Sequence, residues 1–312
     1  MSKPKHRPTS LIQAIRYFSD LDVCIQFVAN CRWSGNPICP QCAGTEHSYL
    51  TTRRLWKCKA CKKQFSVKVG TIFEDSALGL DKWLPAVWLI ANSKNGISSH
   101  ELARALDTTQ KSAWFMLHRI RLGMQAKTFE KMTGHVEVDE TYIGGKARFQ
   151  HESKKKHIGT GGMGKAAVMG LLERHGPDGH SIVRTKVVPN VRRYALAPEV
   201  HKHVEPGAEV FTDSLKSYAD LKADYVHKVI DHAERYVDGE VHTNGLENFW
   251  SLLKRGLHGT YVSVEPFHLF RYLDERVFTY NLRELDDYGR FQTVLRAIAG
   301  RRLTYAELTA QP

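Results

Sequence analysis

The stretch HTNGLENFWSLLKRGLHGTY, which runs from His242 to Tyr261, decides how the C-terminal half of this chain folds. An amphipathic helix there would carry Asn244, Glu247 and Lys254 on one stripe, because offsets of three and seven residues return to nearly the same face. The opposite face could be buried in a core, since it holds Leu246, Phe249, Trp250 and Leu253. A carboxylate beside a lysine suggests a metal ion next to a phosphate. The alternative is a capping box from Asn244 to Glu247.

Two upstream acidic residues are candidate partners for Glu247. Asp139 lies in the β-like segment HVEVDETYIGGK, and Asp213 follows the apolar pair Val210 and Phe211 in AEVFTDSLKSY. An ionised aspartate in a buried strand needs a cation or a hydrogen-bond donor. Three converging carboxylates provide the hard oxygen ligands that Mg²⁺ or Mn²⁺ prefers. Asp213 has a second interpretation, as the N-cap of a helix that follows it.

The blocks VEVDETYIGGK, FTDSLKSY and HTNGLENFWSLLKRGLHGTY resemble the three motif blocks of DDE-type insertion-sequence transposases. More narrowly, they resemble the branch of that family with an N-terminal zinc ribbon. The resemblance extends from about Ile38 to Arg283. It implies a ribonuclease H-like α/β domain with a mixed five-stranded sheet, and the element order βββαβαβα that the sequence pattern predicts agrees. In that fold the first and fourth strands are adjacent, which would bring Asp139 and Asp213 together.

The resemblance also implies roles for individual residues. Asp139, Asp213 and Glu247 match the three catalytic acids, and Lys254 matches the basic residue two helical turns beyond the third acid. Some members of this branch use an asparagine as the third ligand, which makes Asn244 the alternative to Glu247; the charge of two divalent ions favours Glu247. Two Mg²⁺ (or Mn²⁺) ions held by these acids would activate water for strand cleavage, and the freed 3′-OH would attack target DNA.

Four of the six cysteines form two CxxC pairs, CPQC and CKAC, separated by fifteen residues. This spacing predicts one structural Zn²⁺ held by four thiolates, with Cys39, Cys42, Cys58 and Cys61 as ligands. Three aromatic residues are placed to pack a small β-ribbon beside the metal: Tyr49, Trp56 and Phe65. A disulfide framework is the alternative, which a cytosolic setting disfavours.

The segment SSHELARALDTTQKSAWFMLHRIRLGM, residues 98–124, predicts two helices joined by a short turn near Asp107–Thr109. This is the pattern of a helix-turn-helix, and an ordinary helical hairpin is the alternative. The predicted DNA-contacting residues are those that begin the second helix and two arginines in its basic end: Thr109, Gln110, Lys111, Ser112, Arg119 and Arg121.

Charge and hydropathy indicate the class of partner. The chain of 312 residues has a net charge of +12 and a pI near 9.4, which favours double-stranded DNA as the partner. No apolar run reaches the roughly 18 residues of a membrane-spanning helix. The basic and polar start MSKPKHRPTS lacks the apolar centre of a secretory signal. We therefore expect no membrane partner and a cytoplasmic protein, nucleoid-associated when active.

The domain organisation predicted from these patterns is multidomain α+β. It comprises an N-terminal helical segment (1–30), a zinc ribbon (31–75), a helix-turn-helix-like domain (76–130), the catalytic domain (131–285) and a C-terminal helical tail (286–312). Residues 146–165 form a basic insertion within the catalytic domain, for which a mobile loop is expected. Its GTGGMGK string lacks the GxxxxGK[ST] spacing, so no ATP site is expected.

Taken together, these features predict a transposase that binds the ends of an insertion sequence, cleaves there and transfers the strand into target DNA. A homo-oligomer, at least a dimer, is expected in the complex that joins two ends. Two alternatives remain: a zinc-ribbon DNA-binding regulator with an inactive nuclease-like domain, and a structure-selective nuclease of the same fold.

Overall fold

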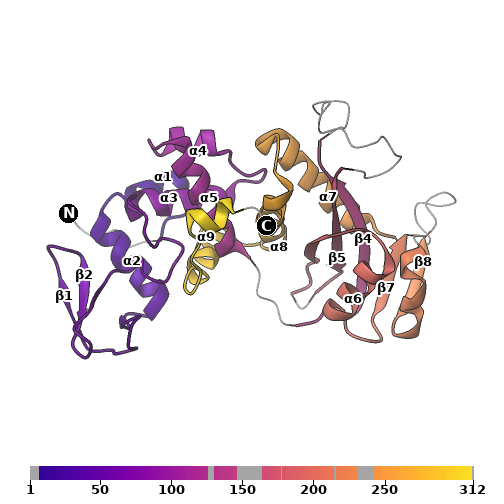
Figure 1. The fold of residues 1–312 in the computed structure, drawn as a ribbon, viewed down its shortest axis with the longest axis horizontal. Helices are drawn as coiled ribbons and strands as arrows, with labels where there is room; N and C mark the ends of the chain where they lie inside the picture. Colours follow the sequence, from indigo (N-terminus) through magenta and orange to yellow (C-terminus); the bar gives the residue numbers. More distant parts are fainter. Residues whose placement is uncertain are drawn as a thin grey trace. The chain divides into compact units, whose positions relative to one another are not determined.

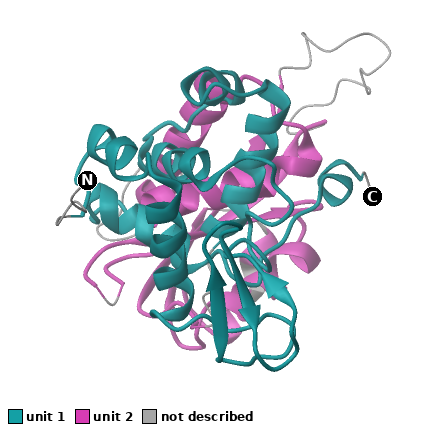
Figure 2. Ribbon diagram, turned by 90° about the vertical axis from the view of Figure 1, so that its left-hand side faces the viewer, with its two compact units in different colours: residues 1–125, 282–312 teal, residues 126–281 magenta. Residues whose placement is uncertain are grey.

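The computed structural model describes residues 7–125, 130–145, 164–176, 178–213, 216–230 and 242–310. The chain divides into two compact units, residues 1–125 with 282–312 and residues 126–281 (Figure 2). The chain passes from unit 1 to unit 2 after residue 125 and returns to unit 1 after residue 281. Its C-terminal segment therefore belongs to the unit that contains the cysteines. The finer division into five parts stays a prediction. Most of the basic insertion, residues 146–163, lies outside the described residues.

The N-terminal part of unit 1 contains two helices and a small antiparallel sheet (Figure 1). Its elements are α1 (Leu11–Tyr17), α2 (Leu21–Trp33), β1 (His47–Leu50), β2 (Leu55–Cys58) and β3 (Gln64–Phe65). The apolar pattern through residue 29 suggests one helix, but the chain starts a new helix after Asp20. The Asp20 carboxylate accepts the backbone N–H of Asp22 at 2.8 Å and so caps α2.

The predicted helix pair follows in unit 1, after a long buried helix. These elements are α3 (Leu80–Asn92), α4 (Ser99–Ala105) and α5 (Gln110–Met124). Hydroxyl groups cap both helices of the pair, because Ser98 accepts the N–H of Glu101 and Thr109 accepts the N–H of Ser112. The predicted helices and the turn between them are present.

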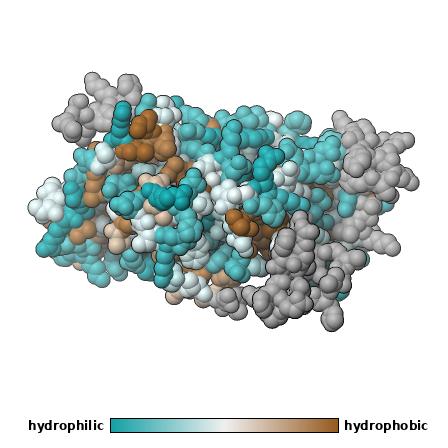
Figure 3. All heavy atoms as spheres, turned by 90° about the horizontal axis from the view of Figure 1, so that it is seen from above, coloured by the Kyte–Doolittle hydropathy of each residue, from teal (hydrophilic) through white to brown (hydrophobic). Residues whose placement is uncertain are grey.

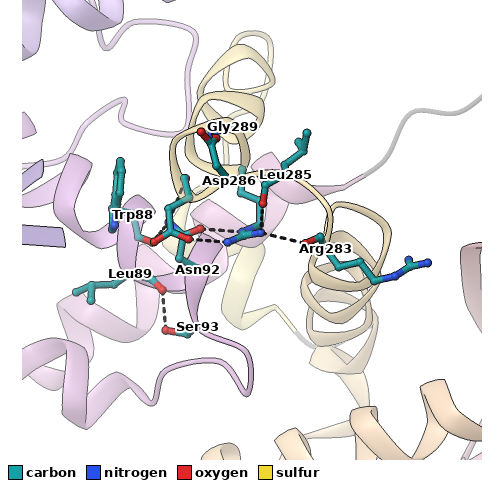
Figure 4. Close-up of polar contacts among 10 residues, drawn as sticks. Trp88, Leu89, Asn92, Ser93, Arg283, Leu285, Asp286 and Gly289 are labelled. Atoms are coloured by element: carbon teal, nitrogen blue, oxygen red, sulfur yellow. Dashed lines mark hydrogen bonds and ion pairs between the residues drawn. The ribbon is translucent and has the colours of Figure 1, made fainter. Parts of the chain in front are cut away.

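Two C-terminal helices complete unit 1, α9 (Asp287–Arg296) and α10 (Tyr305–Thr309). Polar contacts join α9 to the end of α3, as Figure 4 shows. Arg290 donates to the side chain of Asn92 at 2.8 Å, and the Asn92 amide donates to the carbonyl of Asp287 at 3.2 Å. Phe291, fully buried, packs against Trp88 with ring centroids 5.2 Å apart. These contacts explain why residues 282–312 belong to this unit.

Unit 2 is built on a mixed five-stranded sheet in the order β6-β5-β4-β7-β8. The strands are β4 (His135–Ile143), β5 (Ala166–Glu173), β6 (Ile182–Val188), β7 (Glu209–Asp213) and β8 (Val226–Ile230). Strands β4, β7 and β8 are parallel, while β5 pairs antiparallel with both β4 and β6. The predicted mixed five-stranded sheet is confirmed.

Helices cover both faces of this sheet (Figure 1). The helical elements are α6 (Arg193–His203), the 3₁₀ helix η3 (Lys216–Ala223), α7 (Asn244–Gly256), the π-helical turn η4 (Leu257–Tyr261), η5 (Pro266–His268) and α8 (Leu269–Asn281). Val136 and Val138 pack with residues of α6 and η3, whereas Val168 and Leu172 pack with α7 and α8. The sheet is therefore the middle of three layers, with α7 against one face.

Strand β4 pairs with β5 from Val136 to Ile143, so Asp139 lies within the strand, in agreement with the β-like segment of the sequence. One element of unit 2 differs from its predicted form, because the helix predicted after Asp213 is a 3₁₀ helix. Its buried residues Tyr218 and Leu221 are three apart, the spacing that aligns side chains at three residues per turn.

The surface agrees with the polar composition of the chain. On the face drawn in Figure 3, hydrophilic residues cover most of the described surface, and apolar residues form smaller groups between them. None of the helices in the described part of the chain has the length and hydropathy that crossing a bilayer requires.

Candidate active site and zinc site

The two candidate aspartates come from neighbouring parallel strands. Val136 of β4 lies opposite Val210 of β7, and Glu137 lies opposite Phe211. Asp139 and Asp213 each lie two residues beyond this last pair on their own strand, and the charge of Asp213 acts on Asp139. Parallel pairing of β4 with β7 therefore brings two carboxylates, far apart in the sequence, near each other.

Helix α7 makes direct contact with Asp139. The indole Nε1 of Trp250 donates to Oδ2 of Asp139 at 2.9 Å, and the backbone N–H of Glu140 donates to Oδ1 at 2.8 Å. Gly170 is the residue of β5 opposite Asp139, and a Cβ there would lie 2.6 Å from the Trp250 ring. A glycine at this position lets the indole reach the carboxylate, which fixes α7 against the middle of the sheet.

The carboxyl groups at this place repel one another. The pKa of Asp139 is raised from 3.8 to about 6. Burial is the main cause of this pKa shift, the charges of Asp213 and Glu247 add to it, and hydrogen bonds from Glu140 and Trp250 act in the opposite direction. Burial, and then the charges of Asp139 and Asp213, raise the pKa of the Glu140 carboxyl to about 9. Several carboxyl groups that disfavour each other's ionisation are suited to a divalent cation, which would neutralise them. The donor set therefore fits Mg²⁺ or Mn²⁺.

A groove of about 500 Å³ opens beside these acids. Its lining residues are Asp139, Glu140, Thr141, Glu247, Trp250, Ser251 and Lys254. Glu247 and Lys254 both face the groove, as the spacing along α7 predicts. Neither Asn244 nor Asp213 is part of this lining, although the charge of Asp213 acts on Asp139.

The start of α7 decides between the two interpretations of Asn244. The helix begins at Asn244, its N-cap is Thr243, and the Thr243 side chain makes no capping hydrogen bond. The capping-box interpretation, with Asn244 as N-cap, is therefore wrong. Asn244 occupies the first helical position and is exposed. Glu247, three residues after Asn244, lines the groove.

Three groove residues did not emerge from the sequence pattern as site residues: Glu140, Thr141 and Ser251. Trp250 was assigned only to the apolar face of α7, yet it is both buried and hydrogen-bonded to Asp139. Two sequence patterns could have predicted some of these residues. Strand alternation places Thr141 on the same face as Asp139, and Trp250 and Ser251 follow Glu247 by three and four residues.

The four cysteines of the CxxC pairs lie together. Their sulfur atoms are all within 4.8 Å of one another, with 3.7 Å between Cys39 and Cys61 and 3.5 Å between Cys42 and Cys58. Four sulfurs bound tetrahedrally to one zinc ion at about 2.3 Å would be about 3.8 Å apart. Backbone N–H groups, that of Cys61 first, lower the pKa of the Cys58 thiol to about 7, which favours the thiolate that a metal binds.

The aromatic residues around this cluster pack as predicted. The Trp56 ring is stacked on Phe65 at 6.0 Å between centroids, and Tyr49 lies 5.1 Å from Trp56. Trp33 of α2 completes the group, edge-on to Trp56 at 5.5 Å. The preceding helix therefore packs against the small sheet, and the cluster fits one structural Zn²⁺.

The predicted DNA-contacting residues fall into two groups. Thr109, Gln110, Lys111 and Ser112 lie at the start of α5 and are not buried. Arg119 and Arg121 are only 3% and 1% exposed. The Arg119 guanidinium donates to the carbonyl of Glu74 and lies 5.1 Å from the Phe115 ring centroid. Burial argues against a direct DNA contact for these two arginines.

Comparisons with known proteins agree with this arrangement. Residues 131–281 match the ISXO2-like transposase domain, and residues 20–64 match the transposase zinc-ribbon domain. The chain is 29% identical over 244 residues to a protein in transposable element ISH50 of Halobacterium salinarum, covering 74% of this chain and 81% of that protein. It is 33% identical over 104 residues to a transposase-like protein of Haemophilus influenzae, covering 33% of this chain and 84% of that protein.

The first match spans the sheet with the acidic residues, and the second contains all four clustered cysteines. Together these two domains imply DNA binding. The resemblance seen in the motif blocks is confirmed: the chain belongs to the insertion-sequence transposases that join a DDE domain to an N-terminal zinc ribbon.

Proposed function

We propose that this chain cleaves DNA at the ends of an insertion sequence and transfers the cut strand into target DNA, using divalent metal ions. The observation that supports this most is the convergence of acids from three elements. Asp139 on β4, Asp213 on β7 and Glu247 on α7 interact electrostatically, and a groove opens beside them.

The topology supports a ribonuclease H-like assignment for unit 2. Its sheet has three parallel strands and an antiparallel pair, in the order β6-β5-β4-β7-β8, so the first strand of the unit is central. This is the arrangement that the resemblance implies, with the first and fourth strands adjacent.

In the proposed mechanism, Asp139, Asp213 and Glu247 would hold two Mg²⁺ or Mn²⁺ ions. When bound, such ions supply a nucleophile at neutral pH and stabilise the leaving 3′ oxygen. Trp250 keeps Oδ2 of Asp139 in place by its hydrogen bond, so the carboxylate has one orientation. Lys254 lines the same groove and would bind a phosphate near the scissile bond. No residue needs to form a covalent bond with DNA, and no ATP is required.

DNA recognition in this proposal belongs to unit 1. The zinc ribbon and the exposed start of α5, residues 109–112, are the proposed contact regions. The net charge of +12 favours a DNA phosphate backbone as partner. We expect at least a dimer, since two element ends must be held together, and activity in the cytoplasm at the nucleoid.

Substitution of Lys254 tests the groove directly. Lys254→Ala should reduce strand transfer about tenfold to a hundredfold, because one phosphate contact beside the reacting centre is lost. Lys254→Arg should keep part of the activity, since the positive charge is retained while the compact ammonium is replaced by a planar guanidinium. Arg255→Ala is the matched control, because Arg255 is exposed and does not line the groove. Equal, mild losses for the two alanine variants would mean a diffuse basic surface and contradict the role of Lys254.

Metal binding should weaken as the pH falls through about 6. The pKa of Asp139 is raised from 3.8 to about 6, mainly by burial, so below that pH a proton competes with the metal ion. For the metal-free protein, the folding stability that Asp139 contributes changes with pH in the opposite direction to its metal affinity. Protonation of Asp139 favours the folded state below pH 3.8, and that contribution is lost as the pH rises through 6.

Calorimetric titration of zinc-loaded protein with Mn²⁺ at several pH values measures this effect. Affinity should drop about fivefold between pH 6 and pH 5 and about tenfold for each further pH unit, as expected for one proton that competes with a pKa near 6. Asp139→Asn should bind weakly at every pH. An affinity that does not change across this range would show that Asp139 is not a ligand.

A cleavage assay separates this proposal from its two alternatives. The full-length protein is incubated with Mg²⁺ and labelled duplex DNA that carries the terminal repeats of the element. The transposase proposal expects nicks at the repeat ends and joined target products. A regulator with an inactive nuclease-like domain would bind the repeats without cutting, and a structure-selective nuclease would cut branched DNA regardless of sequence.

A further inference from the structure

We infer that the buried ion pair of Glu137 and Arg174 is a positioning device that sets the place of the third metal-binding acid, Glu247. This inference rests on the proposed function of the acid cluster. It concerns two residues that do not line the groove and would not touch DNA or metal. Their contacts reach all three elements that provide the acids.

Glu137 caps α7 from the neighbouring sheet. The first N–H groups of a helix have no partner within the helix, and the N-cap Thr243 does not supply a side-chain acceptor here. Oε2 of Glu137 accepts the backbone N–H of Leu246 at 2.9 Å. The residue that follows Leu246 is Glu247. A carboxylate at this place also interacts favourably with the positive end of the helix dipole.

Arg174 compensates the buried charge and extends the network. The Glu137 side chain is 1% exposed, and Nε of Arg174 lies 2.7 Å from its Oε1. The other end of the guanidinium donates to the carbonyl of His242 and lies 2.8 Å from Nδ1 of that residue. The residue His242, which leads into α7, is therefore also fixed through its backbone carbonyl. Buried polar networks of this kind fix one arrangement when every contact is made.

The same two residues reach both strands that provide aspartates. Glu137 lies two residues before Asp139 on the same face of β4. The Arg174 guanidinium lies 4.6 Å from the centroid of the Phe211 ring, and Phe211 lies two residues before Asp213 on β7. One ion pair therefore contacts β4, β7 and the start of α7.

The glycine in the motif supports this arrangement. A Cβ at Gly245 would lie 2.9 Å and 3.0 Å from the two carboxylate oxygens of Glu137, and 2.9 Å from a methyl group of Leu172. Any larger residue would push the first turn of α7 away from Glu137. The absence of a side chain at this position is what allows the carboxylate to approach the helix end closely.

The test is the affinity for Mn²⁺, measured by calorimetry on full-length, zinc-loaded protein without DNA. Glu137→Gln should weaken binding about tenfold to a hundredfold, the range usual for groups that orient metal ligands. Arg174→Lys should weaken it less, since charge is kept. Cleavage should then need a correspondingly higher Mn²⁺ concentration. Zinc content should not change.

The matched control is Glu173→Gln. Glu173 is also buried, at 5% exposed, and its carboxylate accepts the N–H of Thr133 at 2.7 Å. Among the described residues its hydrogen bonds are with Thr133 and not with α7, so its loss should affect stability but not Mn²⁺ affinity. If Glu137→Gln and Glu173→Gln lower the melting temperature equally and both keep wild-type Mn²⁺ affinity, the inference is overturned.

Two further variants keep the outcomes distinct. Glu247→Gln reports on the proposed function: if it binds Mn²⁺ like the wild type, the acid cluster itself is wrongly assigned. If Glu247→Gln loses binding while Glu137→Gln keeps it, only the positioning inference fails. Should Glu137→Gln not fold, Gly245→Ala takes its place. It must weaken Mn²⁺ binding, and a wild-type affinity would count against the inference.

Discussion

Asp139→Asn, Asp213→Asn and Glu247→Gln are each expected to abolish strand cleavage and to leave binding of element ends almost intact. The loss should be about 10³-fold or more, at least as large as that of removing one transition-state hydrogen-bond donor. The physical reason is that each change removes one negative charge from the ligand set of a divalent metal site. Cleavage is measured on labelled end DNA with Mg²⁺, and binding by gel shift with the same DNA.

Asn244→Ala is the informative companion to Glu247→Gln. Asn244 lies one helical turn before Glu247 and is not part of the groove lining. The Asn244→Ala protein should therefore cleave DNA at a rate near that of the wild type. A protein with Glu247→Gln that still cleaves, together with an inactive Asn244→Ala protein, would make Asn244 the third ligand.

Removal of zinc is expected to unfold the small sheet and to abolish end binding. Cys58→Ser should lower the zinc content from one ion per chain to near zero, because structural zinc supplies much of the folding free energy of such domains. The emission of Trp56, buried beside the cluster, should shift to longer wavelength. Unit 2 should stay folded, so the far-ultraviolet dichroism should fall only in part.

Cys31→Ala is the matched control for the zinc site. Cys31 is half-buried and lies outside the group of four sulfurs. It should keep one zinc ion per chain and normal end binding. A stoichiometry well below one zinc ion in wild-type protein purified without oxidation would argue against the site, as would equal zinc loss in Cys31→Ala.

Local patterns sufficed for several parts of this structure. The CxxC spacing predicted the cysteine cluster, because two tight turns leave four thiolates few other arrangements. Offsets along residues 242–261 predicted that Glu247 and Lys254 share a face, since helix geometry fixes that relation. The sequence pattern also predicted that three strands precede the first helix of the catalytic domain, as β4, β5 and β6 do.

Parts that depend on packing between distant elements were harder to predict. Arg119 follows a basic pattern that suggests an exposed helix end, yet α5 is covered on that side and the guanidinium is buried. The contact of Trp250 with Asp139 could be predicted only by knowing that Gly170 lies opposite Asp139 on β5 and leaves room for the indole. Likewise, Glu137 resembles an ordinary strand residue until α7 is placed over it. Helix periodicity shows which residues share a face, but not what covers that face.

The central claim is that Asp139, Asp213 and Glu247 together hold divalent metal. Anomalous diffraction at the manganese edge, from crystals of the full-length protein soaked in Mn²⁺, tests it most directly. The account predicts anomalous density at about 2.0–2.2 Å from carboxylate oxygens, with all three residues among the ligands. Density that touches Asn244 and not Glu247, or no density at these residues under saturating Mn²⁺, would contradict it.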